Sequence, residues 1–243
     1  GLFDAYIEKY KKIKMESTGA VRELAKLFLN NLYGKMASST DSSFKVAFIN
    51  DKGLISFKNV TANDKKIGYI PVGSAITSYA KNFTIRGAQA NYYGKDKRGF
   101  IYADTDSVHC DLEPHELKDL IIHNVNFNSW SLESQWDEAI FVRQKTYIEH
   151  LVVKDGKPCK PKYDIKCAGM PQRCKNIFEM SLREYDESEL DQFDDEVREF
   201  ANKFADEKKT IQDFKIGLQL HGKLIPKRIS GGIVLVDTTY VMR

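Results

Sequence analysis

An apolar stretch interrupted by two aspartates constrains the fold of this chain most strongly. Residues 100–110 read FIYADTDSVHC, so a strand-forming run reaches Asp104, passes one threonine, reaches Asp106 and turns apolar again. This pattern predicts two short strands around the aspartates. Alternate residues of an extended strand point to the same side, so the two carboxylates would repel each other unless a cation lay between them. A divalent metal site is therefore one interpretation, and an ordinary acidic turn is the other.

Periodic apolar residues predict the elements that precede this stretch. Helical spacing marks residues 3–13 and 15–36, with Ser17 or Thr18 as the cap of the second helix and Gly34 near its end. A hairpin is predicted within residues 43–57, with its turn at Asn50–Gly53, and a third helix over residues 71–93. The second helix carries an apolar stripe of Val21, Leu24, Leu27, Phe28, Leu32 and Met36.

The elements that follow are predicted to alternate between strands and helices. A short helix is expected over residues 115–124, strands over 138–158 with a turn at Asp155–Gly156, and a strand and turn over 163–171. Apolar residues spaced by three and four predict one amphipathic helix over residues 190–204, and a last strand follows the double glycine at 231–232. The class is therefore α+β.

Charge is distributed unevenly along the chain. The 243 residues carry a net charge of +3, but residues 184–207 hold 11 acidic and 2 basic side chains, a net −9, so the remainder carries +12. A basic body suits a partner with a phosphate backbone, and an unevenly charged solvated surface is the alternative. No run of 18 apolar residues and no signal-peptide pattern is present, so we expect no membrane association.

The four cysteines do not form a metal-binding pattern. Cys110, Cys159, Cys167 and Cys174 contain no C-x-x-C pair, which favours free thiols in a reducing cytoplasm. A zinc site built from the last three with a histidine is the alternative.

The polar face of the second helix is suited to an elongated anion. Arg22, Lys26, Asn30 and Tyr33 follow one another at helical spacing and span about 16 Å. Two cations, an amide and an aromatic ring match the shape of a nucleoside triphosphate, and Lys14 would add a third cation. An ordinary solvated helix face is the alternative.

Several motifs together resemble those of family B DNA polymerases. YADTDS at 102–107 and KLFLNNLYG at 26–34 resemble motifs C and B, and KTY at 145–147 is similar to the K-x-Y motif that follows motif C. IKCAGM at 165–170 and GGIVLVDTTY at 231–240 resemble the protein-primed branch, the phi-twenty-nine-like replicases of small phages and linear plasmids. The resemblance covers nearly the whole chain.

The resemblance implies a partial α+β right-hand polymerase fold with fingers helices, part of an antiparallel palm sheet, and a thumb. It implies four regions: fingers helices at 1–36, a palm-inserted processivity hairpin at 37–72 (core about 42–66), palm at 73–170, and a thumb with an acidic helical insertion at 171–243. The acidic insertion is expected to face away from DNA or to contact a basic partner.

The resemblance also implies roles for individual residues. Asp106 would ligate the catalytic metals, with Asp104 as its supporting neighbour. The implied nucleotide-binding residues are Lys14, Arg22, Lys26, Asn30, Tyr33 and Gly34. Lys145 and Tyr147 would steady the primer terminus, and Lys166 would lie near the primer strand.

The implied activity is template-directed DNA synthesis with strand displacement, in which two Mg²⁺ (or Mn²⁺) ions assist transfer of dNTPs to a 3′-hydroxyl. The implied partners are a DNA primer-template, dNTPs and a terminal priming protein, in the cytoplasm of a bacterial host.

Two departures from the family pattern limit this interpretation. Asn31 stands where motif B has a serine, and both motif A, D-x-x-S-L-Y-P, and the exonuclease carboxylates are absent from the chain. We therefore expect the chain to be a C-terminal portion that is inactive without an N-terminal polymerase and exonuclease portion.

Three rival interpretations remain. The first is a non-catalytic DNA-binding clamp or a degenerate polymerase relic, which would not need Asp106. A reverse transcriptase or RNA polymerase palm is disfavoured because Thr105 separates the aspartates, which those enzymes usually carry as a direct pair. The cysteine spacing argues against a small metal-binding or redox domain.

Overall fold

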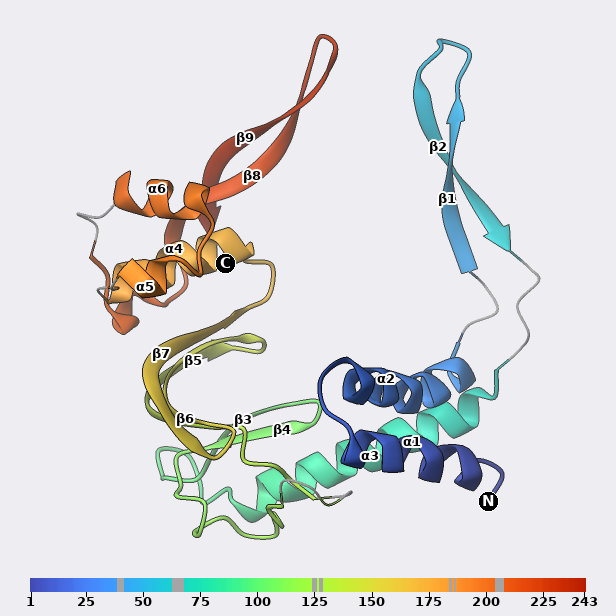
Figure 1. Ribbon diagram of the computed structural model, residues 1–243, viewed down its shortest axis with the longest axis vertical. Helices are drawn as coiled ribbons and strands as arrows, with labels where there is room; N and C mark the ends of the chain where they lie inside the picture. The colour runs from blue at the N-terminus through green and yellow to red at the C-terminus, as the bar shows by residue number, and fades with distance from the viewer. Residues whose placement is uncertain are drawn as a thin grey trace. The chain divides into compact units, whose positions relative to one another are not determined.

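The chain folds into two compact units of mixed helix and antiparallel sheet, Gly1–Leu120 and Ile121–Arg243 (Figure 1). The computed structural model describes residues 1–38, 42–62, 68–123, 126, 129–183, 185, 187–203 and 208–243. The predicted α+β class is confirmed. Within the described ranges, the helices are all too short or too polar to span a bilayer.

Three helices form the frame of the first unit. They are α1 (Asp4–Glu16), α2 (Gly19–Met36) and α3 (Ile70–Ala90). α1 packs against α2, where Tyr6 donates a hydrogen bond of 3.0 Å to the Phe28 carbonyl and Tyr10 stacks on the Phe28 ring at 4.8 Å. α2 in turn packs against α3. A Cβ on Gly73 of α3 would lie 2.7 Å from that of Ala37, so glycine permits this close approach.

The apolar stripe of α2 does not form a core within the described part of the unit. Ala25 is the buried residue of this helix, whereas Val21, Leu24 and Leu27 are 53%, 54% and 53% exposed. The helical spacing was therefore a correct indicator of helix and a poor indicator of burial, because a stripe is buried only where another element covers it.

Two antiparallel hairpins complete the first unit. The first comprises β1 (Ser42–Ile49) and β2 (Ile55–Ala62), and the second comprises β3 (Phe100–Asp104) and β4 (Ser107–Cys110). The side-chain oxygen of Asn50 accepts hydrogen bonds of 3.0 Å from the amides of Lys52 and Leu54, which closes the predicted β1–β2 turn. The predicted core of the inserted hairpin region extends into residues 63–66, which lie outside the described residues.

The second unit contains a sheet, a long hairpin and short helices. The sheet orders β5 (Ser134–Arg143), β6 (Thr146–Lys154) and β7 (Lys157–Cys167), and the hairpin pairs β8 (Gln219–Ile229) with β9 (Gly232–Val241). The helices are α4 (Gln172–Leu182), α5 (Glu187–Leu190), α6 (Asp195–Lys203) and a 3₁₀ turn at Ile211–Asp213. One sheet face, α4, the 3₁₀ turn and the chain end enclose the core, which includes Ile148, Cys174, Phe178, Phe214 and Met242.

Two sequence-based helix predictions are wrong. Residues 115–123 form turns, bends and irregular backbone instead of a helix, because the buried Asn91 side chain bonds both backbone groups of Lys118, at 2.9 and 3.0 Å, and Asp119 adopts a positive φ of 56°. Residue 124, the end of the predicted helix, lies outside the described residues. The single helix predicted over residues 190–204 is divided into α5 and α6 by residues 191–194; Phe204 lies outside the described residues.

Candidate functional site

The two aspartates lie at the tip of the β3–β4 hairpin. Asp104 ends β3 and pairs with Ser107, the first residue of β4, so Thr105 and Asp106 form a two-residue turn. The prediction of two short strands is confirmed. The premise that both carboxylates project from one extended strand is wrong, because Asp106 lies in the turn and Thr105 has a φ of 54°. The turn leaves Asp106 exposed and Asp104 half-buried.

Hydrogen bonds from three hydroxyl groups define the conformation of this acidic turn. The Thr105 hydroxyl donates to Oδ1 of Asp104 at 3.1 Å, and the Ser107 hydroxyl donates to the Asp104 carbonyl at 3.1 Å. From α3, the Thr84 hydroxyl donates to the Thr105 carbonyl at 2.9 Å. The turn is thus held both internally and by the neighbouring helix.

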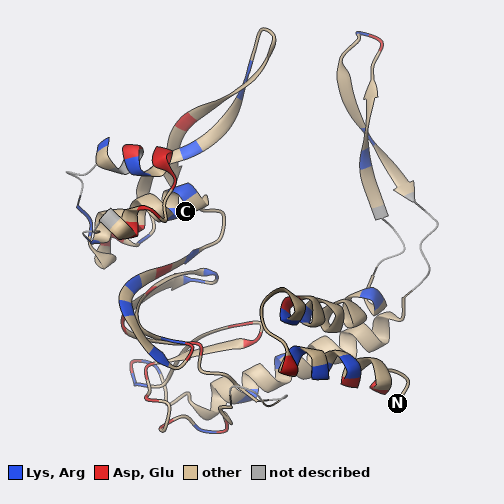
Figure 2. Ribbon diagram, in the orientation of Figure 1, with Lys and Arg blue, Asp and Glu red and all other residues tan. Residues whose placement is uncertain are grey.

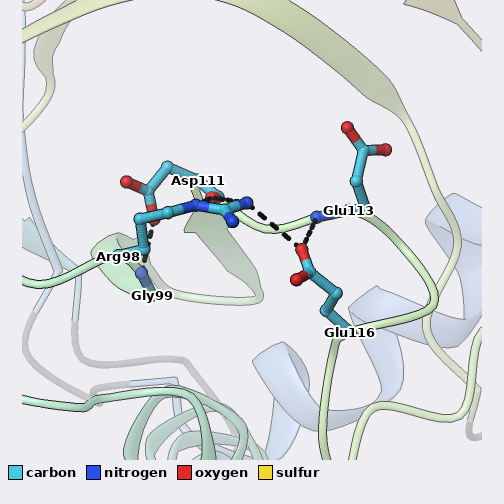
Figure 3. Close-up of polar contacts among 5 residues, drawn as sticks. All are labelled: Arg98, Gly99, Asp111, Glu113 and Glu116. Atoms are coloured by element: carbon cyan, nitrogen blue, oxygen red, sulfur yellow. Dashed lines mark hydrogen bonds and ion pairs between the residues drawn. The ribbon is translucent and has the colours of Figure 1, made fainter.

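A polar cluster closes the other end of the same hairpin (Figure 3). The Arg98 guanidinium donates to the Asp111 carbonyl at 3.0 and 3.2 Å and to Oε2 of Glu116 at 3.2 Å. The Gly99 amide donates to the Asp111 carboxylate, and the Glu113 amide donates to Glu116 at 2.8 Å. This backbone donor, with the nearby Arg98 charge, lowers the pKa of Glu116.

Three cations gather where α1 ends and α2 begins. Lys14 is half-buried, and Arg22 and Lys26 are exposed one helical turn apart. Burial, followed by the positive charges of Lys26 and Arg22, lowers the pKa of Lys14, while Glu23 opposes the shift. Such mutual repulsion is relieved when an anion binds, so the cluster is suited to a phosphate group. The structure therefore brings together the three cations predicted to bind a nucleotide.

The remaining predicted nucleotide residues continue along α2. Asn30, Tyr33 and Gly34 are exposed in its second half, and the Tyr33 side chain is 38% exposed. The Ser38 hydroxyl donates to the Gly34 carbonyl at 2.9 Å, which helps to end the helix. An exposed tyrosine ring at this position is available for stacking, and its predicted role with a nucleotide stays a prediction.

The predicted primer residues form a group of their own in the second unit. Lys145 lies in the β5–β6 turn with a φ of 58°, and its carbonyl accepts a hydrogen bond of 2.9 Å from the Ala168 amide. Tyr147 pairs with Lys166 on β7 and stacks on Phe141 at 5.2 Å. The aromatic rings and the Lys166 amine therefore come from neighbouring strands of one sheet.

An open cleft of about 530 Å³ lies beside this group. Its lining includes Lys154, Lys162 and Lys166 with Asp164 and Glu179. Lys166 forms an ion pair of 3.1 Å with Asp164, and burial raises the pKa of Glu179. The charges of opposite sign largely balance each other in this cleft.

The acidic segment is packed onto the second unit and forms ion pairs with cations of that unit. Figure 2 marks the acidic and basic residues along the ribbon. Val197 and Phe193 are buried against Ile177 of α4. The pairs include Arg173 with Glu196 at 3.8 Å, Arg183 with Glu189 at 3.2 Å and Lys160 with Glu189 at 2.9 Å. Basic residues of the second unit therefore provide some of the contacts that were expected from a basic partner. Residues 184, 186 and 204–207 of the segment lie outside the described residues.

The donor set of the acidic turn fits magnesium better than zinc. Mg²⁺ binds through one or two carboxylates and completes its octahedron with water and substrate phosphates. Two aspartates on an exposed turn can provide the carboxylates. Among the residues that the structure describes, no three His, Cys, Asp or Glu side chains cluster as metal ligands. The four cysteines are free thiols, and Cys167 and Cys174 are buried.

Sequence reasoning missed the residues that hold the β3–β4 hairpin and the segment after it. Thr84 of α3, its C-cap residue Asn91 and Arg98 in the loop that follows all contact the β3–β4 hairpin or the segment after it. Their residue types are ordinary for a helix or a loop. Only the positions of their partners, 9 to 27 residues away, reveal the contacts.

Comparison with known proteins identifies relatives of the chain. The model of a family described as DNA polymerase type B, organellar and viral, matches residues 1–127. The DNA polymerases of Bacillus phage phi29, Bacillus phage Nf and Streptococcus phage Cp-1 are 35%, 34% and 33% identical to this chain, which aligns completely with 38%, 38% and 36% of their lengths.

Solved structures give the same result. Phi29 DNA polymerase complexed with primer-template DNA and incoming nucleotide substrates superposes with a TM-score of 0.70 at 31% identity, over 100% of this chain and 38% of that chain. The complex with single-stranded DNA gives a TM-score of 0.69 at 31% identity, over 100% and 39% of the two chains. The resemblance inferred from the motifs is confirmed, and the chain spans less than two fifths of the length of these relatives.

Proposed function

The chain belongs to the family DNA polymerase type B, organellar and viral, and we propose that it is the C-terminal portion of a template-directed DNA polymerase. The enzyme transfers the deoxynucleotidyl group of a dNTP to the 3′-hydroxyl of a primer, with release of pyrophosphate, as the relatives' names and the DNA and nucleotides in their structures support. The observation that carries the proposal is the exposed acidic turn at 104–106, braced within the same unit that holds the cation cluster.

Each group of side chains has a distinct role in this proposal. Asp106, with Asp104 beside it, holds divalent metal ions, which when bound activate the attacking hydroxyl and stabilise the departing pyrophosphate. The cation cluster of Lys14, Arg22 and Lys26 neutralises the triphosphate through charge-assisted hydrogen bonds.

Two further groups orient the substrates. Asn30, Tyr33 and Gly34 form the surface for the nascent base pair. In the second unit, Lys145, Tyr147 and Lys166 contact the primer strand, where the amines pair with phosphates and the ring packs against a sugar or base.

The portion of the enzyme that this chain lacks supplies the rest of the site. Two-metal chemistry needs carboxylates on more than one side of the ions, and the chain has no motif A or exonuclease motif. We therefore propose that the chain alone does not extend primers. A terminal priming protein, strand displacement and a bacterial host cytoplasm belong to the same proposal.

Primer extension tests this proposal directly. The chain is assayed alone, and fused behind the portion of phi29 polymerase that precedes the matched region, with primer-template DNA, dNTPs and Mg²⁺ or Mn²⁺. We expect the fusion to extend the primer and the unfused chain not to extend it. Asp106→Asn in the fusion should lower the extension rate by at least about 10³-fold. Asp96→Asn, an exposed turn carboxylate in the same unit, serves as the matched control and is expected to keep full activity.

Two results would count against the proposal. Extension by the unfused chain would show that the missing portion is dispensable. Equal activity of the fusion and its Asp106→Asn variant would remove the acidic turn from catalysis and favour the non-catalytic DNA-binding clamp, which predicts metal-independent DNA binding by both.

A further inference from the structure

We infer that Thr84 of α3 is a positioning residue for the acidic turn, because its hydroxyl fixes the peptide group that leads into Asp106. The Thr84 side chain is 7% exposed, and its Oγ1 lies 2.9 Å from the carbonyl oxygen of Thr105. The inference rests on the proposed function in one respect: the positioning matters for activity only if Asp106 holds metal ions.

The geometry of a peptide bond explains how one hydroxyl controls a carboxylate. The Thr105 carbonyl lies in the same plane as the amide and Cα of Asp106. A bond to that carbonyl therefore restricts ψ of Thr105 and φ of Asp106, the two angles that direct the Asp106 side chain. Thr105 already has a φ of 54°, a conformation sparsely populated by non-glycine residues, so the turn needs a contact that selects it.

The alternative role for Thr84 is an ordinary hydrogen bond within its helix. The Ala80 carbonyl lies 3.3 Å from the same hydroxyl, a common arrangement for a helical threonine. A hydroxyl has one proton to donate, and the Thr105 carbonyl is the nearer acceptor at 2.9 Å. The burial of Thr84 against the hairpin also favours the contact between elements.

A second contact, at the C-terminal end of α3, holds the other end of the hairpin. Asn91 is the C-cap residue of α3 and follows Thr84 by seven residues. The Asn91 carbonyl accepts a hydrogen bond of 2.8 Å from Phe100, the first residue of β3. Gly87, which lies between them in the sequence, is buried. Thr84 of α3 therefore holds the hairpin at its tip, and the C-cap residue Asn91 holds it at its beginning.

Nuclear magnetic resonance on the isotope-labelled chain tests the inference without polymerase activity. Thr84→Val removes the hydroxyl and keeps the shape, and Thr84→Ser keeps the hydroxyl. Thr77→Val is the control, because among the described residues the Thr77 hydroxyl bonds carbonyls of its own helix. The readouts are the carbonyl ¹³C resonance of Thr105, the rate of amide hydrogen exchange at residues 106 and 107, and the Mn²⁺ concentration at which paramagnetic broadening halves the intensity of those two amide signals.

In Thr84→Val, the Thr105 carbonyl resonance should move upfield and the two amides should exchange about 5-fold faster. Half-broadening should require about 10-fold more Mn²⁺, the lower range for a residue that orients a metal ligand. Thr84→Ser should restore all three readouts, and Thr77→Val should match the unmodified chain.

Unchanged carbonyl resonance and exchange in Thr84→Val would overturn the inference. So would faster exchange along the whole of α3 without rescue by serine, since that pattern describes a residue that only stabilises the helix. If Mn²⁺ broadens no amide of the unmodified chain, the proposed metal site fails, while the carbonyl and exchange readouts still decide the role of Thr84.

Discussion

Replacing Gly99 with alanine should detach the beginning of the β3–β4 hairpin from Asn91, the C-cap residue of α3. Gly99 has a φ of 141°, and a Cβ at this position would lie 2.3 Å from the Asn91 carbonyl oxygen and 2.9 Å from the Tyr93 ring. Ordinary contact begins at 3.4 Å, so the backbone must move by about 1 Å. That movement breaks the 2.8 Å hydrogen bond from the Phe100 amide to Asn91.

The cost has two parts that a control can separate. The strained backbone angle contributes roughly 1–3 kcal/mol, and the lost hydrogen bond at a buried carbonyl adds roughly 1–3 kcal/mol. Gly94→Ala provides the control, because Gly94 has a φ of 120° and its Cβ would meet only Lys97, at 3.8 Å. We expect Gly99→Ala to reduce the free energy of unfolding of the first unit by about 2–6 kcal/mol, and Gly94→Ala by about 1–3 kcal/mol.

Urea denaturation followed by circular dichroism measures the difference. Both tryptophans, Trp130 and Trp136, lie in the second unit, so their fluorescence reports on that unit and should not change in either variant. Equal costs for Gly99→Ala and Gly94→Ala would refute the reasoning, because only the former should break a hydrogen bond.

Three further predictions concern packing, thiol reactivity and charge. Phe178→Ala should destabilise the second unit by about 3–5 kcal/mol in urea unfolding followed by tryptophan fluorescence. Ile225→Ala, at an exposed position of β8, should cost no more than about 1 kcal/mol. Similar costs for the two variants would place Phe178 outside the core. At pH 8, iodoacetamide should modify Cys159 at least about 10-fold faster than Cys174, which is buried with a pKa raised to about 11, and mass spectrometry showing the reverse order would contradict this burial. The pKa of Lys14 is lower in the folded chain than its ordinary value of 10.5. At pH values between these two pKa values the unfolded chain binds more protons than the folded chain, so the free energy of unfolding due to this group rises with pH across that interval. Lys14→Met should therefore be more stable than the unmodified chain at pH 7 and lose that advantage as the pH approaches 10.5, and an advantage independent of pH in urea unfolding would exclude the charge as its cause.

Local patterns predicted the elements that local interactions stabilise. The spacing of apolar residues located α1, α2 and α3 within a few residues of their ends. Asn50 and Gly53 identified the β1–β2 turn, because the asparagine side chain bonds backbone amides two and four residues away. The motif residues also identified Asp104, Asp106 and the cations as candidate site residues.

Tertiary contacts decided the elements that the patterns missed. α4 and β8 were not predicted, and both depend on partners distant in the chain: Cys174 of α4 donates its thiol hydrogen to the His221 carbonyl of β8 at 3.4 Å, across 47 residues. The helix expected at 115–124 failed for a similar reason, since the Asn91 amide captures backbone groups of Lys118 that the helix would have used.

The same division applies to the candidate site. The sequence alone determined which side chains could bind metal and triphosphate, because carboxylates, amines and their spacing are properties of the residues themselves. Tertiary structure decided how the acidic turn is held, because the Thr84 hydroxyl reaches the Thr105 carbonyl only after α3 and the hairpin have packed together. A hydrogen bond between elements depends on their relative position, which no single stretch of sequence contains.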